Sequence, residues 1–140
     1  MSKEWNGKKC PTCFQGILGQ RTKLTKFEYR GRVLEYKQEG AWCNACGEGI
    51  VTGKEAAASE SLLDDFMVRV DKEAAFELAR IRKKLGLTQK EAAMIAGGGH
   101  NAFSRYERGE AKPLAAVVNL FRLLERHPEL LKELKRLKAA

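Results

Sequence analysis

The sequence lacks any apolar run long enough to cross a membrane. Its first residues, MSKEWNGKK, are polar and charged, without the apolar stretch of a secretory signal peptide. The chain also has no internal repeat and no low-complexity tract. We therefore expect a soluble, cytoplasmic protein of 140 residues, built from one domain or two small ones.

Histidine is scarce, and the chain has only His100 and His127. His100 lies beside a run of glycines, and His127 precedes Pro128, a position typical of a helix start. No spacing suggests the Ser–His, Cys–His or paired-carboxylate arrangements that nucleophilic and acid–base catalysis use. We predict that the protein is not an enzyme and acts by binding.

The cysteines form two Cys-x-x-Cys pairs, Cys10–Cys13 and Cys43–Cys46, separated by 29 residues. Without a secretory signal, this pairing favours a metal site over disulfides. Four thiolates complete the tetrahedron of a structural Zn²⁺ and leave no open position, which argues against a zinc hydrolase. The alternative is a redox dithiol, but that motif has one pair in a βαβ context. The sequence predicts one structural Zn²⁺ per chain, held by Cys10, Cys13, Cys43 and Cys46.

The residues between the pairs predict strands. Lys26-Phe27-Glu28-Tyr29 alternates in polarity, and Arg30-Gly31-Arg32 is typical of a hairpin turn. The apolar core of so short a domain seldom contributes more than ~3–5 kcal/mol to folding stability. A structural Zn²⁺ contributes apparent binding energies on the order of 10–16 kcal/mol. We predict a zinc-ribbon-like β domain over residues 1–53.

Residues 54–72 predict a helical linker. Leu62, Leu63, Phe66 and Val70 recur at helical spacing. The beginning of this segment is rich in Ala, Ser and Glu and is equally compatible with a mobile connection.

Residues 73–140 predict five helices. Gly86 is typical of a helix end, and Thr88 begins the next helix with a capping box. Pro113 precedes a fourth helix, roughly Leu114–Arg126, and Pro128 starts a fifth. The whole chain is therefore predicted to be α+β, with a small β domain and an all-α domain.

The segment from Leu87 to Gly109, LTQKEAAMIAGGGHNAFSRYERG, predicts two short helices around a glycine turn. In the second helix, Ala102, Phe103 and Tyr106 fall on one side and suit packing. The opposite side carries an amide, a hydroxyl and guanidinium groups, which hydrogen-bond bases and phosphates. This polar side consists of Asn101, Ser104, Arg105 and Arg108. The pattern predicts a helix-turn-helix that binds DNA.

Individual roles follow from side-chain chemistry. Arg105 suits bidentate contact with guanine, and Asn101 suits adenine. Ser104 and Arg108 are expected to contact phosphates, as is Lys90 on the preceding helix. The alternative role of Asn101 is that of a helix N-cap, because it follows the glycine run.

Positive charge is concentrated in the second half of the chain. Residues 1–72 carry 12 Lys and Arg against 10 Asp and Glu, whereas residues 73–140 carry 14 against 8. The net charges are therefore +2 and +6, and the excess accompanies the predicted DNA-binding half. A further basic group is interpreted as a solvated helix face; it comprises Arg80, Arg82, Lys83 and Lys84.

The predicted fourth helix is apolar on two stripes. Val117, Leu120 and Leu124 form one, and Val118 and Phe121 form the other. A symmetric dimer would cover the second stripe, since helix-turn-helix proteins commonly bind two half-sites. The alternative is that the last helix covers both stripes within one subunit.

The segment RKKLGLTQKEAAMIAGGGHNAFSRYERGEAKP, from Arg82 to Pro113, together with HPELL at 127–131 and the paired cysteine motifs, resembles MqsA-type antitoxins of bacterial type II toxin–antitoxin modules. The resemblance covers nearly the whole chain. It implies a zinc-binding N-terminal domain joined to a helix-turn-helix domain of the XRE/Cro type.

The resemblance also implies residue roles and partners. Cys10, Cys13, Cys43 and Cys46 would be the zinc ligands, and Asn101 and Arg105 the residues that read bases. The family forms homodimers through the C-terminal domain, binds palindromic promoter DNA and represses its own operon, which would place it on the nucleoid. Its N-terminal domain holds a cognate toxin, typically an mRNA-cleaving ribonuclease of the MqsR type. The alternative is a stand-alone zinc-containing regulator without a toxin.

Overall fold

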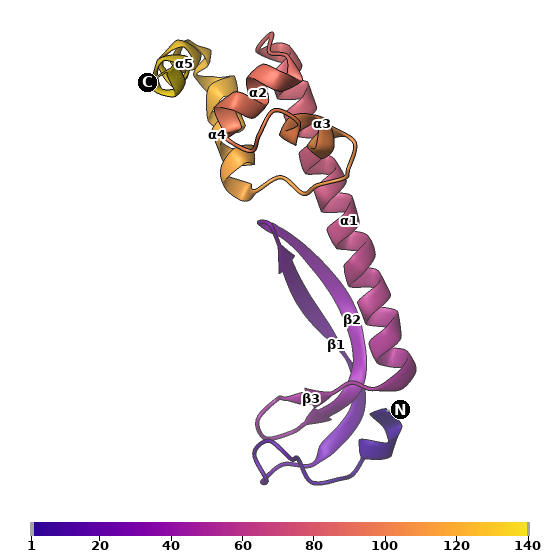
Figure 1. Cartoon of the computed structure of the whole chain (residues 1–140). Helices are drawn as coiled ribbons and strands as arrows, with labels where there is room; N and C mark the ends of the chain where they lie inside the picture. The colour runs from indigo at the N-terminus through magenta and orange to yellow at the C-terminus, as the bar shows by residue number, and fades with distance from the viewer. Residues whose placement is uncertain (1, 140) are drawn as a thin grey trace. The chain divides into compact units, whose positions relative to one another are not determined.

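The chain divides into two compact units, Met1–Val68 and Arg69–Ala140, in a computed structural model that describes residues 2–139 (Figure 1). The first unit contains a small antiparallel sheet, and the second is helical. The predicted α+β fold is confirmed. The unit boundary lies inside a helix, and the predicted domains 1–53, 54–72 and 73–140 stay predictions.

The first unit is built on a long β-hairpin. A 3-10 turn, η1 (Ser2–Trp5), precedes the strands β1 (Leu18–Tyr29), β2 (Arg32–Cys43) and β3 (Gly49–Ile50). They form one antiparallel sheet in the order β1-β2-β3, in which β3 pairs only with the end of β2.

The hairpin turn consists of Arg30 and Gly31, inside the predicted segment Arg30-Gly31-Arg32, whose last residue begins β2. Their φ angles of 52° and 77° are both left-handed, which is the backbone of the two-residue turn that matches strand twist. The pairing then runs without interruption from Tyr29 opposite Arg32 to Leu18 opposite Cys43. This register brings the segments that carry the two cysteine pairs to the same end of the hairpin.

The core of the first unit is small and lies at that end. The cluster of buried residues comprises Cys10, Leu18, Ala41 and Cys43, and two of these four are predicted metal ligands. Farther along the sheet, the ring of Phe27 packs edge-on against Phe66 at a centroid distance of 6.2 Å.

Phe66 belongs to α1 (Gly53–Lys84), a helix of 32 residues. The predicted linker and the first predicted helix of the second half are thus one continuous helix. No glycine or proline interrupts the chain between Gly53 and Gly86, so nothing in this segment breaks the helix. Among the described residues, no helix is both long and apolar enough to span a lipid bilayer.

The end of α1 follows the sequence prediction. Gly86 has a φ of 69°, and its N–H donates to the carbonyl of Lys83 at 3.0 Å. The N–H of Leu87 donates to the carbonyl of Arg82 at 3.1 Å. This pair of bonds satisfies helix-end carbonyls and reverses the chain through a left-handed glycine.

The second unit continues with α2 (Gln89–Ala96), α3 (Ala102–Glu107), α4 (Ala115–Arg126), the 3-10 turn η2 (Pro128–Leu130) and α5 (Leu131–Ala139). The predicted capping box is present: the Glu91 N–H donates to Thr88 Oγ1, and the Thr88 N–H donates to a Glu91 carboxylate oxygen, both at 3.1 Å. Gly97 then ends α2 with a φ of 81°.

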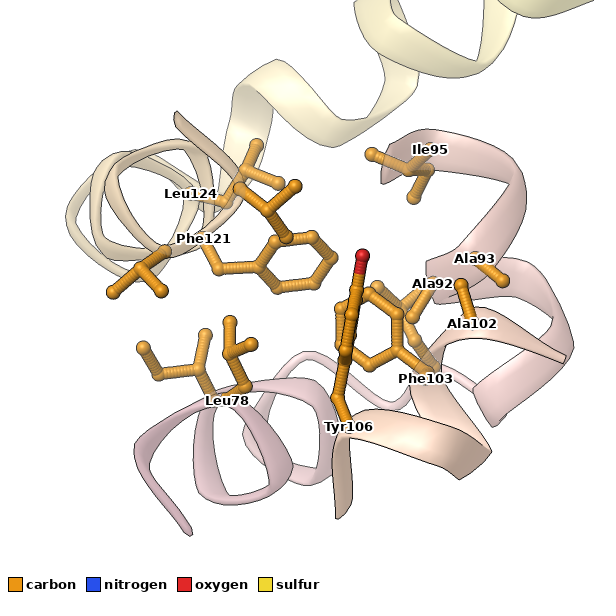
Figure 2. Packing of buried hydrophobic residues seen from close by; sticks show 13 residues of the cluster. Leu78, Ala92, Ala93, Ile95, Ala102, Phe103, Tyr106, Phe121 and Leu124 are labelled. Carbon is orange, nitrogen blue, oxygen red and sulfur yellow. The ribbon is translucent and has the colours of Figure 1, made fainter. Parts of the chain in front are cut away.

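Aromatic rings form the centre of the second core. Figure 2 shows Phe103 and Tyr106 of α3 pointing toward Phe121 of α4. The ring centroids of Phe103 and Phe121 are 4.8 Å apart, and those of Phe103 and Tyr106 are 5.7 Å apart. Leu78 and Ile81 close this core from α1 and are fully buried. The core therefore joins α1, α3 and α4.

Four of the five residues in the two apolar stripes of α4 are buried within one chain, and the fifth, Leu120, is half-buried. Val117 and Leu124 are 8% and 1% exposed, and Val118 and Phe121 are 4% and 0% exposed. The structure covers these four residues within one subunit, in a core that they share with α1, α2 and α3. Of its described residues, the last helix adds only the partly buried Leu131 and Leu134, so it is not the main cover that the alternative expected. The expected dimer therefore needs a different surface, and it stays a prediction.

Candidate metal centre and nucleic-acid interface

The four cysteines converge at the end of the hairpin opposite the Arg30-Gly31 turn. The sulfur atoms of Cys10, Cys13, Cys43 and Cys46 all lie within 4.8 Å of one another. The distance from Cys10 Sγ to Cys46 Sγ is 3.8 Å, and that from Cys13 Sγ to Cys43 Sγ is 3.7 Å. A regular tetrahedron with metal–sulfur bonds of about 2.3 Å has edges of about 3.8 Å. The cluster therefore fits a structural zinc site.

Backbone amides surround two of the sulfurs. The N–H groups of Ala45 and Cys46 donate to Cys43 Sγ at 3.3 and 3.5 Å, and that of Gly16 donates to Cys13 Sγ at 3.4 Å. The amide of Cys46 is the main cause that lowers the pKa of Cys43 to about 6. The amide of Gly16 likewise lowers the pKa of Cys13. Both groups are prepared to bind a cation as thiolates.

The pKa of Cys46 shifts in the opposite direction to those of Cys13 and Cys43 when no cation is bound. The Glu48 amide lowers the pKa of Cys46, but desolvation and the three neighbouring cysteines outweigh it and raise that pKa to about 12. A bound divalent cation reverses this balance, because it removes the repulsion between thiolates.

Close packing around the cluster requires glycine at position 16. A Cβ added to Gly16 would lie 2.2 Å from Cys43 Sγ. The N–H of the next residue, Ile17, donates to Asn44 Oδ1 at 2.9 Å and so joins the first knuckle to the second. The two knuckles, residues 10–16 and 43–49, therefore form one rigid end of the unit.

Ser104 and Arg105 lie on α3, Asn101 and Arg108 are the N-cap and C-cap residues of that helix, and Lys90 lies on α2. Asn101, Arg105 and Arg108 are exposed, and Ser104 is half-buried. The opposite side of α3 is closed, because Ala102, Phe103 and Tyr106 are buried in the second core. Lys90 is exposed on α2. The sorting of polar and apolar faces agrees with the sequence analysis, whereas contact with DNA stays a prediction.

Asn101 occupies the N-cap position of α3 but makes no capping hydrogen bond through its side chain. Within the part of the chain that the structure describes, neither its amide nor the Arg105 guanidinium has a side-chain partner. Arg108 differs, because its Nη2 donates to Glu110 Oε2 at 2.9 Å. Two of the polar groups on α3 are thus available for an outside ligand.

Sequence reasoning missed a network that fixes α3. The guanidinium of Arg82 donates to both carboxylate oxygens of Glu107 at 2.6 and 3.2 Å, and to the Leu87 carbonyl at 2.9 Å. Gln89 Nε2 donates to the same carboxylate at 2.8 Å. The Arg82 side chain is only 12% exposed, so its interpretation as part of a solvated face was wrong.

The position of Glu107 offered a signal for this network. It lies in the last turn of a short helix, where the helix dipole disfavours a carboxylate. Burial alone would raise its pKa, but the hydrogen bonds from Arg82 and Gln89 outweigh burial and hold the pKa below its usual value. A carboxylate in an electrostatically unfavourable place indicates a cationic partner.

A second set of ion pairs joins α1 to α4. Glu125 accepts from Arg80 at 2.6 Å and from Lys84 at 3.2 Å, which lowers its pKa to about 2. Arg122 binds Glu77 through two hydrogen bonds of 2.8 Å. Arg80 and Lys84 are exposed, as predicted, but they are paired.

The chain is similar to known proteins over most of its length. A family model, described as the antitoxin component of bacterial toxin–antitoxin system, MqsA, matches residues 8–135. The curated protein Antitoxin MqsA of Escherichia coli (strain K12) is 42% identical over 130 residues, covering 91% of this chain and 99% of that protein. The solved N-terminal domain of the E. coli protein MqsA is 31% identical with a TM-score of 0.43, covering 45% of this chain and 96% of that one. The chain therefore belongs to the MqsA family of antitoxin components of bacterial toxin–antitoxin systems.

Proposed function

We propose that this antitoxin neutralises a cognate toxin through its cysteine-containing unit and represses its own operon through α2 and α3. The toxin would be an mRNA-cleaving ribonuclease of the MqsR type, and both activities take place in the cytoplasm. Residues 1–53 would hold the toxin, 54–72 would connect, and 73–140 would bind DNA and dimerise. Each activity is a binding event without bond chemistry.

The metal in this proposal is one Zn²⁺ per chain. Soft thiolate ligands in a closed tetrahedral set favour zinc over hard cations such as Mg²⁺ or Ca²⁺. Cys10, Cys13, Cys43 and Cys46 would hold it, and its contribution is structural, because four protein ligands leave no position for a substrate.

The observation that carries the DNA-binding proposal is the unpaired, exposed state of Asn101 and Arg105 on a helix whose other side is buried. An amide and a guanidinium so placed match the bidentate patterns of adenine and guanine in the major groove. Lys90, Ser104 and Arg108 would bind the flanking phosphates. A homodimer would present this face twice and so match a palindromic operator.

The DNA-binding proposal is tested with the Arg105→Ala variant and the DNA upstream of the operon. Losing a bidentate base contact should weaken operator binding by ~1–3 kcal/mol without unfolding the chain. Arg126→Ala removes the same charge from an exposed position on α4 and serves as the control. Equal affinities of the Arg105→Ala variant and the original chain would remove Arg105 from the interface.

The toxin proposal is tested by growth. Each reading frame that neighbours this gene is expressed alone and then together with the antitoxin. One neighbour should arrest growth and cut mRNA, and co-expression should restore growth. If no neighbour is toxic, the protein is a zinc-containing regulator without a toxin partner.

A further inference from the structure

An aromatic residue occupies a glycine-like position in the first knuckle. Phe14 directly follows Cys13 and has a φ of 58°, in the left-handed region that residues with a Cβ rarely adopt. Its side chain is nevertheless 67% exposed, so packing within the unit does not explain the strained backbone. A phenylalanine at a position that favours glycine, with its ring left in solvent, is a reason to look for a functional role.

The second knuckle provides an internal comparison. There the residue after the second cysteine is Gly47, with a φ of 78°. The two Cys-x-x-Cys knuckles therefore place the same kind of backbone at the same position. The chain uses glycine at one and phenylalanine at the other, and the difference is a large apolar side chain presented to solvent.

The backbone at Phe14 is fixed by hydrogen bonds. Its N–H donates to the Cys10 carbonyl at 3.0 Å, and the Cys10 N–H donates to the Gly16 carbonyl at 2.8 Å. The knuckle is closed on both sides of Phe14 by Cys13 and by the tight contact of Gly16 with Cys43. A rigid, exposed aromatic loses little conformational entropy on binding, and this is a property of anchor residues at protein interfaces.

The sequence neighbours of Phe14 are apolar and basic. Ile17, three residues on, is 48% exposed, and Lys8 and Lys9 are exposed on the preceding segment. No Asp or Glu occurs between residues 5 and 27. The complementary surface is therefore an apolar pocket bordered by carboxylates.

We propose that Phe14 is the anchor through which the first unit docks into an apolar, acid-rimmed pocket of the toxin. This inference rests on the proposed toxin-binding role of that unit. A single-stranded nucleic acid could also stack on Phe14, but the aliphatic Ile17 beside it suits a protein surface better than a base.

The test uses the full-length antitoxin and the purified toxic product found by the growth assay. Phe14→Gly should lower toxin affinity at least tenfold and, at the same time, raise the thermal stability of the first unit, because glycine adopts this φ without strain. Phe14→Ala should lower affinity equally without raising stability. Phe14→Tyr should keep the affinity.

Leu24→Ala is the matched control, because Leu24 is also 67% exposed in the first unit but lies on a regular strand. It should change toxin affinity less than twofold. Zinc content is measured for every variant, so that loss of the metal is not mistaken for loss of an anchor. Gain of stability together with loss of binding is an outcome that a merely structural residue does not give.

Three results would overturn the inference. If Phe14→Gly and Phe14→Ala both bind the toxin as tightly as the original chain, the ring is not an anchor. If the Phe14 variants bind single-stranded RNA more weakly but bind the toxin unchanged, the ring contacts nucleic acid and not the toxin. If the original chain binds no product of a neighbouring reading frame, the proposed function fails and the inference fails with it.

Discussion

The two units of this antitoxin are stabilised by different means. Among the described residues, the core cluster of the first unit contains Leu18 and Ala41 beside two cysteines. The second unit instead buries interlocking aromatic rings, with Phe103 and Phe121 fully enclosed. The first unit thus depends on its thiolate cluster and hairpin, and the second on apolar burial. The comparison teaches that one chain can contain two units that fail under different conditions.

The largest effect is expected from Cys43→Ser. Losing one of four thiolates should release the metal, and with it apparent binding energy on the order of 10–16 kcal/mol, so the first unit should unfold. The second unit should stay folded and bind DNA. Metal analysis and backbone NMR measure both outcomes, and Thr12→Ala, at an exposed position of the first knuckle, is the control. Unfolding of both units would show that they are not independent.

Phe121→Ala should instead destabilise the second unit and leave the first intact. Removing this fully buried ring should lower the free energy of unfolding of the second unit by about 3–5 kcal/mol while the metal stays bound. Denaturant titration followed by circular dichroism, with metal content alongside, tests this expectation. Phe76→Ala removes a ring that is 75% exposed and should change little. Release of the metal from the Phe121→Ala variant would contradict the division of roles.

Glu107→Gln should have an intermediate effect confined to the second unit. It leaves the largely buried Arg82 without its anionic partner, which we expect to reduce stability by ~1–3 kcal/mol. Glu110→Gln removes a carboxylate that is 53% exposed and should change stability much less. Equal unfolding midpoints for these two variants would show that the Arg82–Glu107 pair does not stabilise α3.

The same carboxylate predicts a pH dependence. The pKa of Glu107 is lower in the folded chain than its usual value, so its stabilising contribution is complete above the unfolded-state pKa of about 4.3. That contribution is lost as the pH falls through the folded-state pKa. The stability difference between the original chain and Glu107→Gln should therefore shrink in acid and stay constant near neutral pH. A constant difference down to acid pH would contradict this assignment.

The smallest effect is expected from Thr88→Ala. It removes the side-chain half of the capping box on α2 and should destabilise the second unit by ~1 kcal/mol. The thermal midpoint of that unit reports the change, and Lys90→Ala, at an exposed position of the same helix, is the comparison. A shift in the metal-dependent transition would show that the two units are coupled.

Local patterns in the sequence predicted local structure well. The capping box at Thr88, the turn at Arg30-Gly31 and the two faces of α3 each depend on residues close together in the chain. The cysteine cluster was predictable for a different reason, because a tetrahedral site requires two separated pairs to meet.

Features that depend on tertiary contacts were harder to predict. Arg82 and Glu107 are 25 residues apart, and neither pattern nor propensity joins them. The burial of both stripes of α4 likewise depends on how its neighbours pack. The continuity of α1 was predictable from the lack of glycine and proline after Gly53, but the change of composition within the segment suggested a connector.

That continuity bears on how the antitoxin could be destroyed in the cell. Proteases cut chains that are locally extended, and α1 offers backbone in regular helical hydrogen bonds across the whole boundary between the units. Severing the proposed toxin-binding part from the proposed DNA-binding part would require melting of this helix. While both units are folded, cleavage at this boundary would therefore yield no fragment that represses without neutralising. Loss of the metal, which is expected to unfold the first unit alone, would be the route to such a fragment.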